Sequence, residues 1–263
     1  MLRNLFLKSL RDQSKAILGW GLSLAALAYL VMLFYPTIAT MTQYDQLLKQ
    51  MPQLQGFLGD VASFSTLEGY VTAELMAYTP VILAIYVIWA YVGTITGEIE
   101  SGSMDFLLAH PLPRWRVTLE KYAAIMVALV AICAIMGLGM WLGALTIGRG
   151  PGLDVWLLAA LNLVPITLLY GTIAFALACA LRGRGLPVGV AVALAVGGFI
   201  LNGLAPLVQS LKDYREWTIY YLFSASKPFS QDINVGYTAI LLTAIVVLLA
   251  IGVVAFNRRD ILA

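Results

Sequence analysis

The side chains that could carry acid–base, nucleophilic or metal chemistry are few in this sequence. Its 263 residues include one histidine, two cysteines, 14 acidic residues and 16 basic residues. His110 has no second histidine with which to share a metal, and Cys133 and Cys179 lie inside apolar stretches, where a thiol behaves as a small hydrophobic group. Neither a His-Glu-x-x-His zinc motif nor a Gly-x-Ser-Gly nucleophile pattern occurs. We therefore expect no catalytic centre, metal site or cofactor in this chain.

Charged residues gather instead in the segment 97–114, which follows the second apolar stretch. It reads Gly-Glu-Ile-Glu-Ser-Gly-Ser-Met-Asp-Phe-Leu-Leu-Ala-His-Pro-Leu-Pro-Arg. Ser103 is suited to cap a helix and Asp105 to occupy its first turn, where the helix dipole favours an anion, whereas Pro111 stops the helix. We predict a short helix over 104–109. Its apolar side chains would be costly to leave in water, which favours a docking surface for another protein.

The composition places most of the chain in a membrane. Hydrophobic residues make up 61% of it and charged residues 11%, whereas soluble proteins average roughly 45–50% and about 25%. The mean hydropathy is +0.87. Because the hydrocarbon core is about 30 Å thick, a spanning helix needs about 20 mostly apolar residues. Six stretches are long enough, and we predict spans over 16–35, 70–95, 122–147, 155–181, 186–208 and 237–256.

Continuous apolar runs favour helices over the alternating strands of a barrel, because a helix satisfies its own backbone hydrogen bonds. The sequence therefore predicts an all-α integral membrane protein that forms a single transmembrane domain over 1–263. The segment 1–15, before the first span, places Leu5, Phe6 and Leu10 near one helical face and bases around the rest. We expect an amphipathic helix in the membrane interface; the alternative is a basic flank that only fixes orientation.

Lysine and arginine are distributed unequally between the two sides of the predicted membrane. Eleven lie on one side: Arg3, Lys8, Arg11, Lys15, Arg114, Arg116, Lys121, Arg182, Arg184, Arg258 and Arg259. The other five are Lys49, Arg149, Lys212, Arg215 and Lys227. Because cytoplasmic loops are enriched in these residues, we predict that both termini and the segment 97–114 are cytoplasmic. The net charge of +2 and the scattered bases argue against a nucleic-acid partner and leave the lipid bilayer as the expected surrounding.

The segment 97–114 resembles the permease subunits of type-2 ATP-binding-cassette (ABC) exporters. Those carry an acidic pair, Gly-Thr, an acidic residue, Leu-Leu, a small residue, Pro and Ser-Arg, with Lys opening the next span. The matching residues here are Glu98, Glu100, Gly102, Asp105, Leu107, Leu108, Pro111, Arg114 and Lys121. Ser103 replaces the usual Thr and Pro113 the usual Ser. The similarity covers nearly the whole chain, since the length, the six spans, the amphipathic start and the apolar external segment before the last span also fit.

The resemblance implies a non-catalytic permease in the plasma membrane of a bacterium or archaeon, which exports an amphipathic drug, lipid or peptide. The short helix would be a coupling helix seated in a separate ATPase. Two ATPase chains would bind Mg-ATP, and a second permease, identical or homologous, would complete the dimer. The residues expected to contact the ATPase are Glu98, Glu100, Gly102, Met104, Asp105, Phe106, Leu107, Leu108 and Arg114. Met104 and Phe106 are included for their position and apolarity.

The chain has no ATP site of its own by this reading. None of its six lysines follows a glycine, so the Gly-Lys-Ser/Thr of a Walker A loop is missing. An ion-gradient-driven secondary transporter is the alternative. Such proteins place ionisable groups at mid-membrane and interrupt their helices. Glu74 is the one charged residue inside the predicted spans, near the outer end, and Pro80 and Pro165 could kink two of them.

Overall fold

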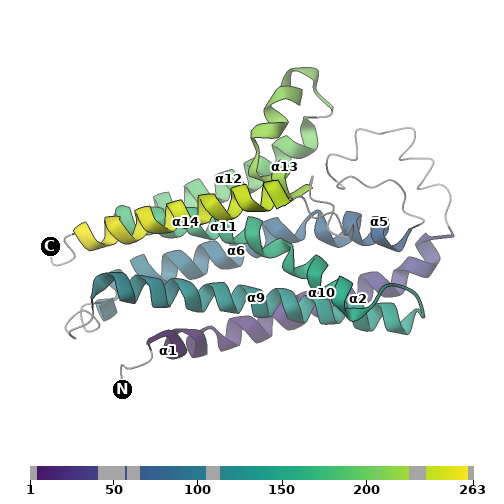
Figure 1. Ribbon diagram of the computed structural model, residues 1–263, viewed down its shortest axis with the longest axis horizontal. Coiled ribbons are helices and arrows are strands. Elements are labelled where there is room, and N and C mark those ends of the chain that lie inside the picture. Colours follow the sequence, from purple (N-terminus) through teal and green to yellow (C-terminus); the bar gives the residue numbers. More distant parts are fainter. Residues whose placement is uncertain are drawn as a thin grey trace.

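The computed structural model describes residues 5–40, 57, 66–104, 113–205, 207–224 and 235–259. Every regular element within these ranges is a helix, which confirms the predicted all-α fold. Six helical stretches are long and apolar enough to cross a membrane, as predicted. They run side by side along the long axis of the molecule (Figure 1).

The candidate spans are made of eleven elements. They are α2 (Ser14–Ile38); α5 (Leu67–Val71), η2 (Thr72–Met76), α6 (Thr79–Val92), η3 (Gly93–Gly97) and α7 (Glu98–Glu100); α9 (Arg114–Thr146); α10 (Leu153–Leu161) and α11 (Leu163–Ala180); and α12 (Gly185–Leu204), with α14 (Val235–Arg258) as the sixth span. Outside the spans, the described residues also form α1 (Leu5–Asp12), η4 (Gln209–Trp217) and α13 (Ile219–Ser224).

Three span boundaries differ from the prediction by several residues. The second span ends at Glu100 and not at 95, because π-helix η3 and α7 continue the helix into the polar segment. The third helix begins at Arg114 and not at 122, because Pro113 is extended and the helix continues past the apolar stretch through the more polar residues 114–121. Nothing in backbone hydrogen bonding stops a helix where the hydrocarbon ends. The fifth helix ends at Leu204 and not at 208, shortly before Pro206, which cannot donate a helical hydrogen bond.

The second and fourth spans are interrupted near their prolines. In the second, the π-helix η2 ends at Met76 and a turn leads into α6, where Pro80 has no amide to offer to the carbonyl of Met76. In the fourth, Pro165 has no amide to donate to the carbonyl of Leu161, and α10 and α11 meet at the next residue, Asn162. The interruptions divide each span without ending it.

The second, third and fourth spans form the centre of the bundle, and the other three surround them. In the fourth span 72% of the most apolar window is buried, against 22% in each of α2, α12 and α14. Tyr91, Tyr122 and Phe175 pack ring against ring in the centre and join α6, α9 and α11. Lipid or a partner protein would therefore meet mainly α2, α12 and α14.

The first and third spans approach each other closely through glycine. A Cβ on Gly139 would lie 2.4 Å from the carbonyl oxygen of Ala25, and one on Gly143 would lie 2.4 Å from the Cβ of Met32. Both glycines are fully covered by α2. Their Gly-x-x-x-Gly spacing therefore serves packing within this chain.

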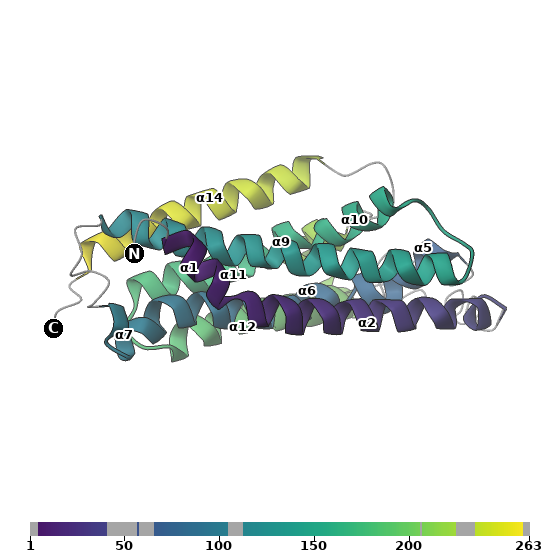
Figure 2. The same ribbon diagram turned by 90° about the horizontal axis from the view of Figure 1, so that it is seen from below.

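Both ends of the described chain lie at the same end of the bundle, together with α7 (Figures 1 and 2). This arrangement is what an even number of spans requires. The amphipathic start forms α1, which a turn at Gln13 separates from α2 and which packs against the beginning of α9. That this end faces the cytoplasm, and that α1 lies in the interface, remain predictions.

Replacing Gly139 by leucine should destabilise the bundle by about 1–3 kcal/mol or more, because the new side chain would force α2 away from α9. Gly19→Leu on α2 is the matched control, since a Cβ there meets nothing within 4 Å. Thermal unfolding of both purified variants in detergent measures the difference. Equal melting temperatures for the two variants would contradict this account of the packing.

Candidate functional site

Six elements meet, through charged side chains and terminal backbone groups, at the end of the bundle that carries the termini. We call this region the polar end: α1, α7, the beginnings of α9 and α12, and the ends of α11 and α14. Hydrogen bonds and ion pairs join these elements to one another. The segments are far apart in the sequence, so the contacts tie one end of each helix to its neighbours.

A buried ion pair holds the beginning of the loop 97–114 against the third span. The Nζ of Lys121 on α9 pairs with Oε1 of Glu98 on α7. Lys121 is only 3% exposed, whereas the Glu98 side chain is 32% exposed. Because little water surrounds the ammonium group, the attraction between the two charges is stronger than at an open surface.

A second, exposed pair joins the same loop to the fifth span. Nε of Arg184, just before α12, lies 2.6 Å from Oε2 of Glu100. Both side chains are 45% exposed. The guanidinium group also lies over Gly97, where a Cβ would come within 3.0 Å of it. The absence of a side chain at Gly97 leaves room for the guanidinium group of Arg184.

The far flank of the loop is tied to the last span. Arg114 at the start of α9 donates through Nη1 to the carbonyl oxygen of Arg259, at 2.8 Å. Arg259 in turn donates to the carbonyl oxygens of Ala178 and Cys179, at 2.9 and 3.4 Å. These carbonyls belong to the last turn of α11. Carbonyls in the last turn of a helix have no donor within the helix and form the negative end of its dipole.

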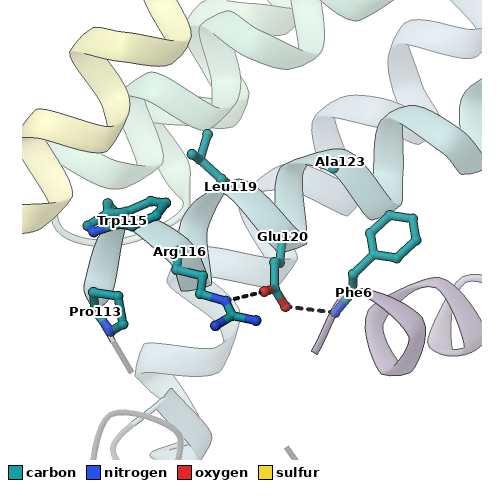
Figure 3. A pocket seen from close by; sticks show the side chains of 7 residues that line it. All are labelled: Phe6, Pro113, Trp115, Arg116, Leu119, Glu120 and Ala123. Atoms are coloured by element: carbon teal, nitrogen blue, oxygen red, sulfur yellow. Dashed lines mark hydrogen bonds and ion pairs between the residues drawn. The ribbon is translucent and has the colours of Figure 1, made fainter. Parts of the chain in front are cut away.

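Glu120 joins α1 to α9. Its carboxylate accepts a hydrogen bond from the backbone amide of Phe6 at 3.0 Å, and its other oxygen pairs with Nε of Arg116 at 2.6 Å (Figure 3). The amide lies in the first turn of α1, where a negative charge is favourable. An open groove of about 560 Å³ lies beside this contact, with Trp115 at the α9 side and Phe6 at the α1 side.

The turn that leads into the predicted coupling helix is described as far as Met104. Gly102 has a left-handed backbone with φ of 72°, which favours glycine. The hydroxyls of Ser101 and Ser103 both donate to the carbonyl oxygen of Glu98 at 3.2 Å. Ser103 is itself helical, so the helical conformation begins at the predicted cap position, one residue before the predicted start at 104.

Apart from Gly102, which forms the turn described above, the predicted contact residues fall into three groups. Glu98, Glu100 and Arg114 lie together at the polar end, each bonded to a different span. Met104 is fully buried within the chain, so its side chain supports the loop from inside. Asp105, Phe106, Leu107 and Leu108 lie outside the described residues, as does the rest of the predicted helix 104–109.

Sequence reasoning missed three residues of the polar end. Arg184, Arg259 and Glu120 were assigned no role in the loop, although the first two were counted as cytoplasmic bases. Only the pair of Arg116 and Glu120 has a sequence signal, the i,i+4 spacing of opposite charges on a helix. The partners of Arg184 and Arg259 are distant in sequence and become visible only in the fold.

The chain matches the model of the family described as multidrug efflux system permease Rv1217c, C-terminal domain, over residues 3–257. The chain belongs to this family. A comparison with curated proteins gave no match. With its six apolar helices, the chain is thus a multi-pass membrane permease and a transporter rather than a catalytic enzyme. Among the described residues of this permease, no three His, Cys, Asp or Glu side chains gather as a metal site would require.

Replacing Lys121 by methionine should destabilise the permease, because it leaves the Glu98 carboxylate partly buried without its partner. Breaking a fully buried pair costs about 3–5 kcal/mol, and the partial exposure of Glu98 lowers our expectation to about 2 kcal/mol. Arg184→Met, at the exposed pair, should cost less than about 1 kcal/mol. Adding Glu98→Gln to Lys121→Met should restore part of the loss. Thermal unfolding tests this order, and an equal loss from both single variants would contradict it.

Proposed function

We propose that this permease is the membrane-spanning subunit of an ABC exporter and that a separate ATPase docks on the loop 97–114. The observation that carries the proposal is that both flanks of this loop are bonded to membrane-spanning helices. Glu98 and Glu100 connect one flank to α9 and α12, and Arg114 connects the other to the end of α14. A docking loop needs such attachments if movement of a partner is to reach the bundle.

The contacts provide a path for force. A push on the loop would act on α9 through the buried ion pair of Lys121 and on α12 through Arg184. From Arg114 it would pass to Arg259 and on to the end of α11. Four of the six spans would then move together, which suits a rigid-body switch between inward-open and outward-open states.

The proposed assembly holds two ATPase chains, which bind Mg-ATP, and a second permease, identical or homologous. Its location would be the plasma membrane of a bacterium or archaeon, with both termini cytoplasmic. The mostly exposed, apolar α2, α12 and α14 offer surface for the second permease as well as for lipid. The family description supports efflux as the direction, and an amphipathic drug, lipid or peptide suits a pathway between apolar bundles.

An ion-gradient-driven secondary transporter receives less support from the described spans. Ion-coupling residues inside membranes face the interior of the bundle. Glu74 instead lies in the π-helix η2 with an exposed side chain. The interruptions near Pro80 and Pro165 are accounted for by the missing amides of the prolines themselves.

Replacing Leu107 and Leu108 together by aspartate should abolish binding of the ATPase while the permease still inserts, because the apolar contact would be lost. The measurement is purification of the tagged permease from its native membrane in mild detergent, with mass spectrometry of what accompanies it. A nearly stoichiometric ATPase with a Walker A motif should accompany the unchanged permease and be lost from the variant. A permease that purifies without any nucleotide-binding chain would overturn the proposal.

The path through the exposed pair is tested by exchanging its charges. Glu100→Arg and Arg184→Glu should each reduce ATPase-driven transport several-fold by like-charge repulsion, and the double exchange should restore much of it. Arg149→Glu, an exposed position after α9 at the opposite end, is the control and should change little. Transport by purified complexes in vesicles is the readout. Loss of transport in the double variant equal to that in the singles would contradict this path.

A further inference from the structure

A polar cavity lies beside the buried ion pair, between α1, η3 and α9. It consists of two adjoining spaces of about 280 and 170 Å³, which share Ser9, Asp12, Glu98 and Lys121 in their walls. The proposed transmission of force through the polar end does not require a cavity at this position. The cavity lies against the amphipathic helix, at the level where the membrane surface is predicted.

Irregular backbone builds this space. The turn at Gln13 bends α1 away from the axis of α2, and the side chain of Gln13 is held by the hydroxyl of Tyr86 at 3.1 Å. On the opposite wall, the π-helix η3 presents Gly93, where a Cβ would meet nothing within 4 Å. Single π-turns of this kind occur often at functional sites.

The charges around the cavity balance. Lys8 and Lys121 are positive, and Asp12 and Glu98 are negative. Lys121 and Glu98 pair with each other, whereas Lys8 and Asp12 form no ion pair within the described part of the chain, although they lie one turn apart on α1. One unpaired cation and one unpaired anion on the same helical face suit a ligand that carries both signs of charge close together.

The cavity also reaches toward the hydrocarbon. Trp89 lies in its wall and is 57% exposed, nine residues before Glu98 along the second span. At about 1.5 Å per residue, this places the indole roughly 13 Å deeper than the charged end. A site that is charged at one end and aromatic at the other, open beside an exposed indole, fits an amphiphile with a compact polar head.

We propose that this cavity binds a zwitterionic phospholipid of the adjoining leaflet, one with a phosphate and an amine in its headgroup. Lys8 holds the phosphate and Asp12 holds the ammonium group, while the acyl chains leave past Trp89 into the bilayer. A headgroup with no amine lacks the partner for Asp12, so the site discriminates against anionic phospholipids. The site does not depend on an ATPase, so it stands or falls separately from the proposed function.

The test is lipid binding to the intact, delipidated permease, followed by native mass spectrometry. Phosphatidylethanolamine and phosphatidylglycerol with identical acyl chains are titrated separately. One ethanolamine lipid should bind at least tenfold more tightly than the glycerol lipid. Equal affinity for the two lipids would overturn the proposal.

Two variants locate the site. Asp12→Asn should weaken binding of the ethanolamine lipid about tenfold and leave the glycerol lipid unchanged, and Gly93→Leu, which fills open space, should abolish selective binding. Asp213→Asn, at another exposed aspartate in η4, is the control and should have no effect. Preference unchanged in both cavity variants would show that the lipid binds elsewhere and overturn the assignment. Should Gly93→Leu unfold, Asp12→Asn on the exposed face of α1 decides the question alone.

A further experiment distinguishes the lipid from a soluble ligand that has the same headgroup. Glycerophosphoethanolamine has the headgroup without acyl chains and should bind at least a hundredfold more weakly than the lipid. Binding of comparable strength would mean that the cavity recognises a soluble molecule, and the lipid assignment would be wrong.

Discussion

The interior of a bilayer offers no hydrogen-bonding partner, so each backbone amide and carbonyl in the six spans must be satisfied by the protein itself. This constraint explains where the spans are irregular. Pro80 and Pro165 each remove one amide, and the backbone adjusts within a turn of the missing donor. Buried threonines contribute locally: the hydroxyl of Thr79 donates to the carbonyl of Leu75 at 2.6 Å, and that of Thr172 donates to Leu168 at 2.7 Å. Each span remains continuous despite its interruptions.

The same constraint drives charge to the ends of the helices, where it becomes useful. Lys121 is buried, yet it lies in the second turn of α9, close enough to water for Glu98 to pair with it. Arg259 reaches back to the last carbonyls of α11, and Glu120 reaches across to the amide of Phe6 in the first turn of α1. Helix termini leave backbone groups unpaired, and these side chains supply the partners. The bonds that complete the helices are therefore also the bonds that hold the polar end together.

The sequence predicts the six spans well because length and apolarity decide them, and these are local properties. The shared position of both termini follows from the even number. The polar end is predictable only in part: Glu98, Glu100 and Arg114 were found through resemblance, but their partners Lys121, Arg184 and Arg259 depend on how distant helices pack. The burial of Met104 could not be predicted from the sequence either, because one apolar residue in a polar loop can face a partner or its own bundle.

Glu98 belongs both to the loop that is proposed to dock the ATPase and to the wall of the proposed lipid cavity. A movement of the loop that stretched the pair with Lys121 would also reshape the cavity. If the lipid binds more tightly when the loop is in one of its two positions, lipid binding shifts the equilibrium between the positions by the ratio of the two affinities. By linkage, a change in the loop position changes the affinity for the lipid by the same factor. The buried pair would then connect the composition of the membrane to the movement of the bundle through a single carboxylate, without any contact between lipid and ATPase.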